Sequence, residues 1–177
     1  MGKPGKPRTA YLKQLDLCEM PSEVSEHHES LQEMESGLSW WGTSLLTYLW
    51  MGSRGCLTGL HSDDEDNFLV QCQGSKRVYL CPPTVDPKDL YVNDKYDSGT
   101  VCCDVDVFQV NLKTHPRFKA VCGEEVELQA GDVLFIPAFW WHSVLTTSHS
   151  SMSLNSFVSR PLERLRRGLG RNLAPRF

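Results

Sequence analysis

The sequence has no apolar run long enough to cross a membrane. Its longest, Leu45–Met51, is interrupted by Thr47, whereas a membrane-spanning helix needs about 20 apolar residues. The basic start of the chain has no apolar stretch behind it, which argues against a secretory signal. Lys6 stands where N-myristoylation requires serine or threonine. We therefore expect no membrane partner.

The cysteines are odd in number and show no regular spacing. There are seven, and no two are arranged as C-x-x-C, which argues against a paired disulfide framework and a zinc cage of the usual spacing. Free thiols are typical of reducing compartments. The composition thus predicts a cytoplasmic or nuclear protein with reduced cysteines.

Positive charge is scarce over most of the chain. The formal net charge is −4, yet residues 160–177 hold six arginines against a single acid, Glu163, so the preceding residues are distinctly acidic. A dedicated nucleic-acid-binding domain presents a broad basic face, and this chain does not. Its basic C-terminal tail either binds phosphate groups or forms a solvated helix end.

The length and composition are those of one globular domain. The chain has 177 residues, of which 40% are hydrophobic and 23% are charged. Residues 1–43 predict an N-terminal segment of a short helix and loops that packs on the core, and residues 160–177 form the basic tail. Residues 44–159 are rich in strand signals separated by Gly and Pro turns, which predicts a mostly-β sandwich or barrel. The expected strands are Ser44–Met51, Asn67–Gln73, Arg77–Cys81, Val126–Leu128, Val133–Ile136, Ser143–Thr147 and Met152–Val158.

Two histidines and one carboxylate are candidates for a metal site. His61 and Asp63 are two positions apart, so on an extended strand their side chains project to the same side. The pattern alone is weak, since His27 and Glu29 repeat it in a polar segment that we interpret as a solvated face. His142, at the start of a distant strand, completes the two-histidine, one-carboxylate set that holds non-haem Fe(II) with open positions.

A series of motifs surrounds these residues. The motifs are Leu60-His61-x-Asp63, Asn67-Phe68, Gly74-x-Lys76-Arg77, Pro82-Pro83, Gly131-Asp132-x-Leu134-Phe135-Ile136-Pro137 and Trp141-His142. Together they resemble those of the JmjC-type oxygenases that use Fe(II) and 2-oxoglutarate, within the small cupin-like hydroxylase branch. The resemblance covers roughly Thr9 to Pro161. It implies a double-stranded β-helix, the jelly-roll fold of the cupins.

The resemblance implies a site for iron and its cosubstrate. His61, Asp63 and His142 would bind the iron. Lys76 would pair with the far carboxylate of 2-oxoglutarate, and a lysine that points into a barrel needs such an anion. The Trp140-Trp141 pair beside the last ligand is more often core than part of a site, so we interpret it as packing.

The same resemblance implies four further contacts to the cosubstrate or the iron. The hydroxyl groups of Tyr11 and Thr58 match positions that hydrogen-bond the far carboxylate of 2-oxoglutarate. Asn67 and Asn155 match asparagines near the cosubstrate and the iron. Each asparagine has a plain alternative as a turn or strand-edge residue.

The resemblance also implies the reaction. Family members use Fe(II), 2-oxoglutarate and dioxygen to hydroxylate a C–H bond, while 2-oxoglutarate loses carbon dioxide and becomes succinate. We expect a protein side chain as the substrate. The acidic turn Asp64–Asp66 beside the iron motif favours a positively charged substrate, or is simply a solvated turn. A tRNA base bound with help from the arginine tail is the second hypothesis. Histone demethylation is disfavoured, because the sequence holds no reader module or zinc site.

The chain is short for this family. Ten residues precede Tyr11 and nineteen follow Val158, where members usually carry flanking strands and often a helical part that dimerises. A third hypothesis is therefore a truncated or minimal form that acts as a binding or scaffold protein with little turnover, although the intact triad and Lys76 argue against it. Missing flanking strands would leave a sheet edge open, which favours self-association, for example as a homodimer.

Overall fold

The computed structural model describes residues 9–16, 44–93 and 100–159. These residues form strands joined by short turns, with one α-helix and one 3-10 helix in the connection between β5 and β8. In chain order the elements are β1 (Tyr11–Asp16), β2 (Ser44–Ser53), β3 (Leu57–Asp63), β4 (Asp66–Gln73), β5 (Lys76–Cys81), α3 (Pro87–Leu90), β6 (Val92–Asn93), β7 (Thr100–Cys103), η3 (Pro116–Ala120), β8 (Glu124–Leu128), β9 (Val133–Ile136), β10 (Trp141–Thr146) and β11 (Ser150–Ser159).

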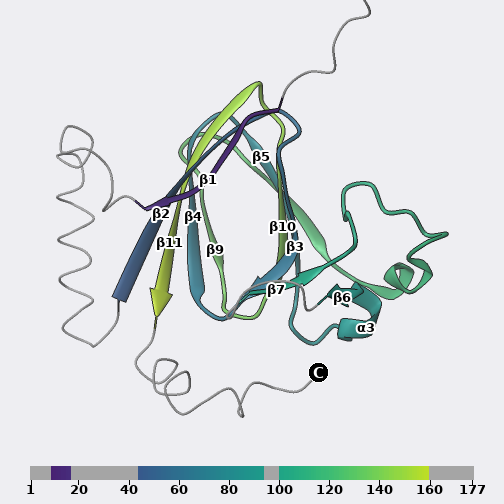
Figure 1. Cartoon of the computed structure of the whole chain (residues 1–177). Helices are drawn as coiled ribbons and strands as arrows, with labels where there is room; N and C mark the ends of the chain where they lie inside the picture. Colours follow the sequence, from purple (N-terminus) through teal and green to yellow (C-terminus); the bar gives the residue numbers. More distant parts are fainter. Residues whose placement is uncertain (1–8, 17–43, 94–99, 160–177) are drawn as a thin grey trace, which may run out of the picture.

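The strands form two antiparallel sheets that face each other (Figure 1). One sheet has the order β1-β2-β11-β4-β9, and the other has the order β6-β7-β3-β10-β5-β8. From β2 to β5, and again from β8 to β11, each strand lies in the opposite sheet from the one before it. This alternation makes the double-stranded β-helix that the family resemblance implied.

Side chains alternate between the interior of the barrel and its outside, as the pleat of a strand requires. In β4, Asn67, Leu69 and Gln71 are at most 1% exposed, whereas Phe68 between them is 39% exposed. The buried positions of this strand include two amides. The interior is therefore partly polar, which is unusual for a space between sheets that serves only as a core.

Two apolar clusters stabilise the fold. The first lies between the sheets and contains Leu69, Val78, Leu128 and Ile136. The second lies between the outer face of the six-stranded sheet and the connection from β5 to β8. Its buried members are Leu60, Tyr79, Cys81, Leu90, Val105, Val107, Phe118 and Trp141. Burying one such large apolar side chain contributes about 1.5–3 kcal/mol, so the second cluster firmly anchors this connection on the sheet.

The N-terminal segment expected over residues 1–43 is described in part. Tyr11–Asp16 forms β1, a strand that pairs with β2 at one edge of the five-stranded sheet. The short helix expected in this segment is thus not formed by these residues. The remainder of the segment, including His27 and Glu29, and the basic tail at 160–177 lie outside the described residues.

All seven strands expected from the sequence are present. The sequence interpretation missed β1, β3, β6 and β7. In β3 the reason is physical, because Gly59 and the polar residues His61, Ser62 and Asp63 hide the alternation of apolar residues that identifies a strand. The residues that form the site therefore obscured the strand that carries them.

Neither disulfides nor membrane-spanning helices contribute to the described part of the chain. Its six cysteines are free thiols, and Cys18 lies outside the described residues. No helix among the described residues is long and apolar enough to cross a membrane.

The turn between β4 and β5 gives a test of the fold. Gly74 there has a φ of +73°, and a Cβ would meet the carbonyl oxygen of Ser150 and the hydroxyl of Ser148. We expect Gly74→Ala to lower the free energy of unfolding, measured by urea denaturation, by about 2 kcal/mol or more. The control is Gly55→Ala, where φ is +84° but no atom lies within 4 Å, so only about 1 kcal/mol should be lost. Equal losses would contradict this packing.

Candidate metal and anion site

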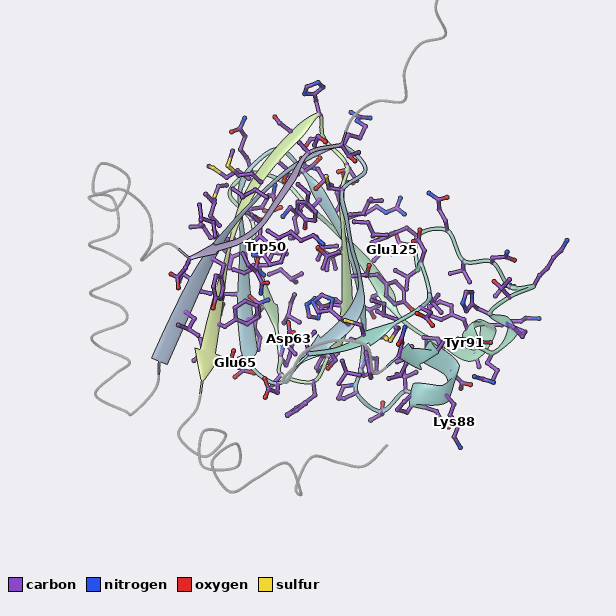
Figure 2. The ribbon with its side chains drawn as sticks, viewed as in Figure 1. Trp50, Asp63, Glu65, Lys88, Tyr91 and Glu125 are labelled. Carbon is purple, nitrogen blue, oxygen red and sulfur yellow. The ribbon has the colours of Figure 1, made fainter. Side chains whose placement is uncertain are left out.

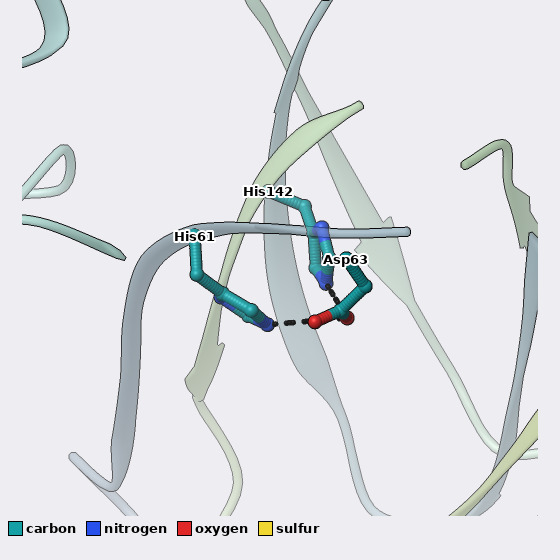
Figure 3. A group of neighbouring side chains, drawn as sticks. All are labelled: His61, Asp63 and His142. Carbon is teal, nitrogen blue, oxygen red and sulfur yellow. Dashed lines mark ion pairs between the residues drawn. The ribbon is translucent and has the colours of Figure 1, made fainter. Parts of the chain in front are cut away.

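The candidate metal ligands lie on two neighbouring strands of the six-stranded sheet. His142 of β10 is directly opposite His61 of β3, and their ring centroids are 4.0 Å apart. Asp63 follows two positions after His61, so the pleat points it to the same interior side. Figure 3 shows the three side chains converging. The pairing of β3 with β10 thus brings His142 next to the His61–Asp63 pair, as the sequence predicted.

The distances within this triad suit a shared ion. The Nε2 atoms of His61 and His142 each lie 3.6 Å from Oδ2 of Asp63, which is too long for a hydrogen bond. One potential ligand atom from each residue lies within 4.8 Å of the others. Adjacent ligands of a six-coordinate first-row metal are about 3 Å apart. Two imidazoles and one carboxylate fit such an ion and leave coordination positions open.

Hydrogen bonds to the backbone orient both rings. The Nδ1 atom of His61 lies 2.8 Å from the carbonyl oxygen of Gly59, and that of His142 lies 3.1 Å from the carbonyl oxygen of Trp140. Since a carbonyl only accepts, each Nδ1 must carry the proton. In the neutral ring each Nε2 then presents its lone pair toward Asp63, as metal binding requires.

Burial keeps His142 in the neutral form. Its side chain is almost fully enclosed, and this loss of hydration lowers the pKa of His142 to about 4, with the nearby His61 adding to the effect. Asp63 and the Trp140 carbonyl act in the opposite direction but more weakly. The ring is therefore a lone-pair donor at neutral pH.

Lys76, at the start of β5, lies in the interior and is 3% exposed. Its ammonium group donates a hydrogen bond to the hydroxyl of Ser153 on β11. Among the described residues, Lys76 has no carboxylate within ion-pair distance. Burial lowers the pKa of Lys76 to about 8. A buried cation without a counter-ion is costly, so a bound anion would stabilise this lysine.

Tyr11 and Thr58 also come together. The phenol oxygen of Tyr11 on β1 lies 2.6 Å from the hydroxyl oxygen of Thr58 on β3. Burial raises the pKa of Tyr11, so the phenol stays protonated and can donate. The structure thus brings together two hydroxyl groups that the family resemblance assigned to one carboxylate, and their contact with a carboxylate stays a prediction.

Trp50 connects this hydroxyl pair to the lysine. Its ring centroid is 5.9 Å from that of Tyr11, and on the strand ladder Trp50 faces Ser153, the hydrogen-bond partner of Lys76. The indole Nε1 is buried and has no hydrogen-bond partner in the described part of the chain. Figure 2 shows Trp50 in the space between the sheets. Sequence interpretation missed this residue, although the alternation of β2 could have identified it as an interior position.

Asn67 and Asn155 are adjacent in the interior, and among the described residues the polar partners of the triad do not include either of them. The Nδ2 atom of Asn155 donates to Oδ1 of Asn67 at 3.2 Å. The Nδ2 atom of Asn67 is buried and has no hydrogen-bond partner within the described ranges. The two amides are therefore interior groups rather than turn residues, and their expected role near a cosubstrate stays a prediction.

Two further contacts hold Asp63, and neither was predicted. Thr100 on β7 donates to Oδ1 of Asp63 at 3.0 Å. The backbone N–H of Phe139 donates to the backbone carbonyl of Asp63 at 2.7 Å, and Phe139 has a φ of +67°. A non-glycine residue in the left-handed region is strained. Both contacts arise from strand register and turn geometry, which single-residue patterns do not contain.

The tryptophans beside His142 pack as expected. Trp141 is 3% exposed and belongs to the outer cluster with Leu60 and Phe118. Trp140 packs against the interior cluster. The packing interpretation of this pair is confirmed.

A model of the cupin-like domain family matches residues 3–162, almost the whole chain. The chain therefore belongs to the cupin-like JmjC family.

Several curated relatives match the core of the chain. Human HSPB1-associated protein 1 is 34% identical over 120 residues, which is 67% of this chain and 25% of that protein. The tRNA wybutosine-synthesizing protein 5 of Gallus gallus is 38% identical over 107 residues, 60% of this chain and 31% of that protein. The Jumonji C domain-containing protein 5 of Drosophila melanogaster is 34% identical over 101 residues, 57% of this chain and 25% of that protein. The chain thus spans about a quarter to a third of these relatives' length.

The buried charge of Lys76 makes a prediction about stability. We expect Lys76→Met to raise the free energy of unfolding of the ligand-free protein at pH 7 by about 1–3 kcal/mol, because burial of the ammonium disfavours folding. Since the pKa is lowered from 10.5 to about 8, the folded chain binds fewer protons than the unfolded chain between these values. Wild-type stability should therefore rise with pH over this range.

The measurement is urea denaturation at pH 7 and pH 9.5. The matched control is Lys113→Met, which changes an exposed lysine and should have almost no effect. Destabilisation by Lys76→Met at pH 7 would show that the charge is already neutralised in the folded protein.

Proposed function

We propose that this protein is an Fe(II)- and 2-oxoglutarate-dependent dioxygenase that hydroxylates a side chain of another protein. The observation that carries the proposal is the pairing of two features in one barrel. A two-histidine, one-carboxylate triad and a buried lysine that has no carboxylate partner among the described residues both face the interior. An oxygenase of this kind needs a metal site with open positions and a separate cation for a dicarboxylate cosubstrate.

The three triad residues would bind the iron, and backbone carbonyls would orient the two histidine rings. Nε2 of His61, Nε2 of His142 and Oδ2 of Asp63 would hold the iron. The bound iron, 2-oxoglutarate and dioxygen would supply the oxidative decarboxylation to succinate and the oxygen atom for a C–H bond. The hydrogen bonds from both Nδ1 atoms to backbone carbonyls keep the ring tautomers that this binding needs.

The cosubstrate would lie with its far carboxylate at Lys76. The hydroxyl groups of Tyr11 and Thr58, and the unpartnered indole N–H of Trp50, supply neutral donors around the same anion. A carboxylate there would pair with the charge of Lys76 and accept a hydrogen bond from the buried indole, so binding relieves two unfavourable features of the ligand-free interior. Ser153 holds the ammonium group in place meanwhile.

The acidic turn near Asp63 supports a basic protein segment as the substrate. Of the three acids, Asp66 is buried and accepts a hydrogen bond from the backbone N–H of Ala138, so its role is structural. Glu65 remains partly exposed, and Figure 2 shows it at the end of the barrel near Asp63. Burial, then the charges of Asp16 and Glu65, raise the pKa of Tyr48. Negative charge therefore gathers at this end, where a lysine- or arginine-containing segment would be attracted.

A tRNA base is the second candidate substrate. It is supported by the relative named for wybutosine synthesis and by the six arginines at 160–177, which lie outside the described residues. The acidic groups near the triad oppose it, because they would repel the phosphate backbone. The protein substrate is therefore the better supported of the two.

The cosubstrate site can be tested before any substrate is known. Anaerobic titration of Fe(II)-loaded protein with 2-oxoglutarate should produce a visible metal-to-ligand charge-transfer band. His61→Ala should abolish the band, and Lys76→Ala should weaken 2-oxoglutarate binding by about 10- to 100-fold, because a charge-assisted hydrogen bond is lost. Lys113→Ala should leave the titration unchanged. A folded wild type that shows no band would contradict the proposal and favour a binding or scaffold role.

The substrate class can be tested by charge reversal. Glu65→Lys should slow hydroxylation of basic peptides, measured by mass spectrometry, by about tenfold at low salt, with the loss shrinking as salt rises. Glu127→Lys changes an exposed acid on β8, at the edge of the six-stranded sheet three strands away from β3, so it is the matched control and should change little. If Glu65→Lys leaves peptide turnover intact but strengthens tRNA binding, the tRNA hypothesis replaces the protein one.

A further inference from the structure

The carboxylate of Asp63 has different partners on its two oxygens. Oδ2 lies 3.6 Å from the Nε2 atoms of both His61 and His142. Oδ1 accepts a hydrogen bond from the hydroxyl of Thr100 at 3.0 Å. One oxygen is thus directed to the metal position, and the other is occupied by a neutral donor.

The strand register explains why Thr100 can do this. β7 pairs with β3 on the side away from β10, and Thr100 is directly opposite Asp63. Directly opposed residues in an antiparallel pair share a face, so the two side chains meet. Threonine is β-branched and has few χ1 rotamers, which holds its hydroxyl in a defined place. β7 is itself paired with β6, through Val92 and Cys103.

The geometry points to Thr100 as a positioning residue that keeps Asp63 a one-oxygen ligand. A carboxylate can bind a metal through one oxygen or both. Two-oxygen binding would take one more coordination position, and the proposed reaction needs three to remain open. By occupying Oδ1, the Thr100 hydroxyl opposes that second mode. The inference rests on the proposed function only in requiring that the triad binds a divalent metal.

The hydrogen bond from Thr100 to Asp63 also means that the connection between β5 and β8 helps to position a metal ligand. This segment contains β7 and is anchored on the outer face of the sheet through Leu90, Val105 and Phe118. The backbone carbonyl of Asp63 is held separately by the N–H of Phe139. Main chain and side chain of Asp63 are therefore fixed from two different segments, and among the described residues Thr100 supplies the hydrogen bond to the carboxylate.

The experiment uses Co(II) as the probe and needs neither substrate nor turnover. Calorimetry gives the Co(II) affinity, and the visible d–d absorption reports the number and arrangement of ligands. Thr100→Val keeps the shape but removes the hydroxyl, and we expect the Co(II) affinity to fall by about tenfold, the loss typical when a partner of a metal ligand is removed. The absorption should change as well, because the carboxylate is then free to bind through both oxygens. Thr100→Ser should restore the wild-type spectrum.

Three outcomes separate this inference from the proposed function. The matched control, Thr114→Val, removes a hydroxyl from an exposed turn of the same connection and should behave as wild type. If Thr100→Val is folded and has the wild-type Co(II) affinity and spectrum, the inference is overturned while the metal site stands. If the folded wild type binds no Co(II), or binds it equally well after His61→Ala, the proposed metal site itself fails.

Discussion

The antiparallel pairing of β3 with β10 is the constraint on which the site depends. It sets His61 directly opposite His142, and the two-residue period of β3 then adds Asp63 on the same face. A slip of one residue in this register would send His142 to the outer face and bring Trp141 inward. The large apolar surface of Trp141, buried with Leu60 and Phe118, opposes such a slip. The outer cluster therefore stabilises the register that forms the inner site.

Stability and binding make opposite demands on the interior. The amides of Asn67 and Gln71, the ammonium of Lys76 and the indole of Trp50 occupy space that apolar residues would fill more favourably. The interior cluster around Leu69 and Val78 and the outer cluster under the β5–β8 connection offset that cost. Among the described residues, the buried indole N–H of Trp50 and an amide N–H of Asn67 have no hydrogen-bond partner, so the interior holds polar groups that an apolar core would not.

Much of the fold and the three triad residues could be predicted from the sequence. Turn signals and alternating residues marked the strands of the core, and the H-x-D motif with a later histidine marked the triad. β3 and β7 were not predicted, because β3 is rich in polar residues and β7 is short. The places of Thr100 and Trp50 in the site were not predicted for a different reason. Their positions depend on which residue lies opposite which across a pair of strands, and that information is absent from a single chain's local pattern.

The most direct test of the account is a crystal structure of the protein grown with Mn(II) under anaerobic conditions. We expect one anomalous peak inside the barrel, within about 2.3 Å of both Nε2 atoms and of Oδ2 of Asp63. We also expect that Oδ1 remains with Thr100. A triad without a peak in a saturated crystal, or a peak held by other residues, would contradict the claim that His61, Asp63 and His142 form a metal centre.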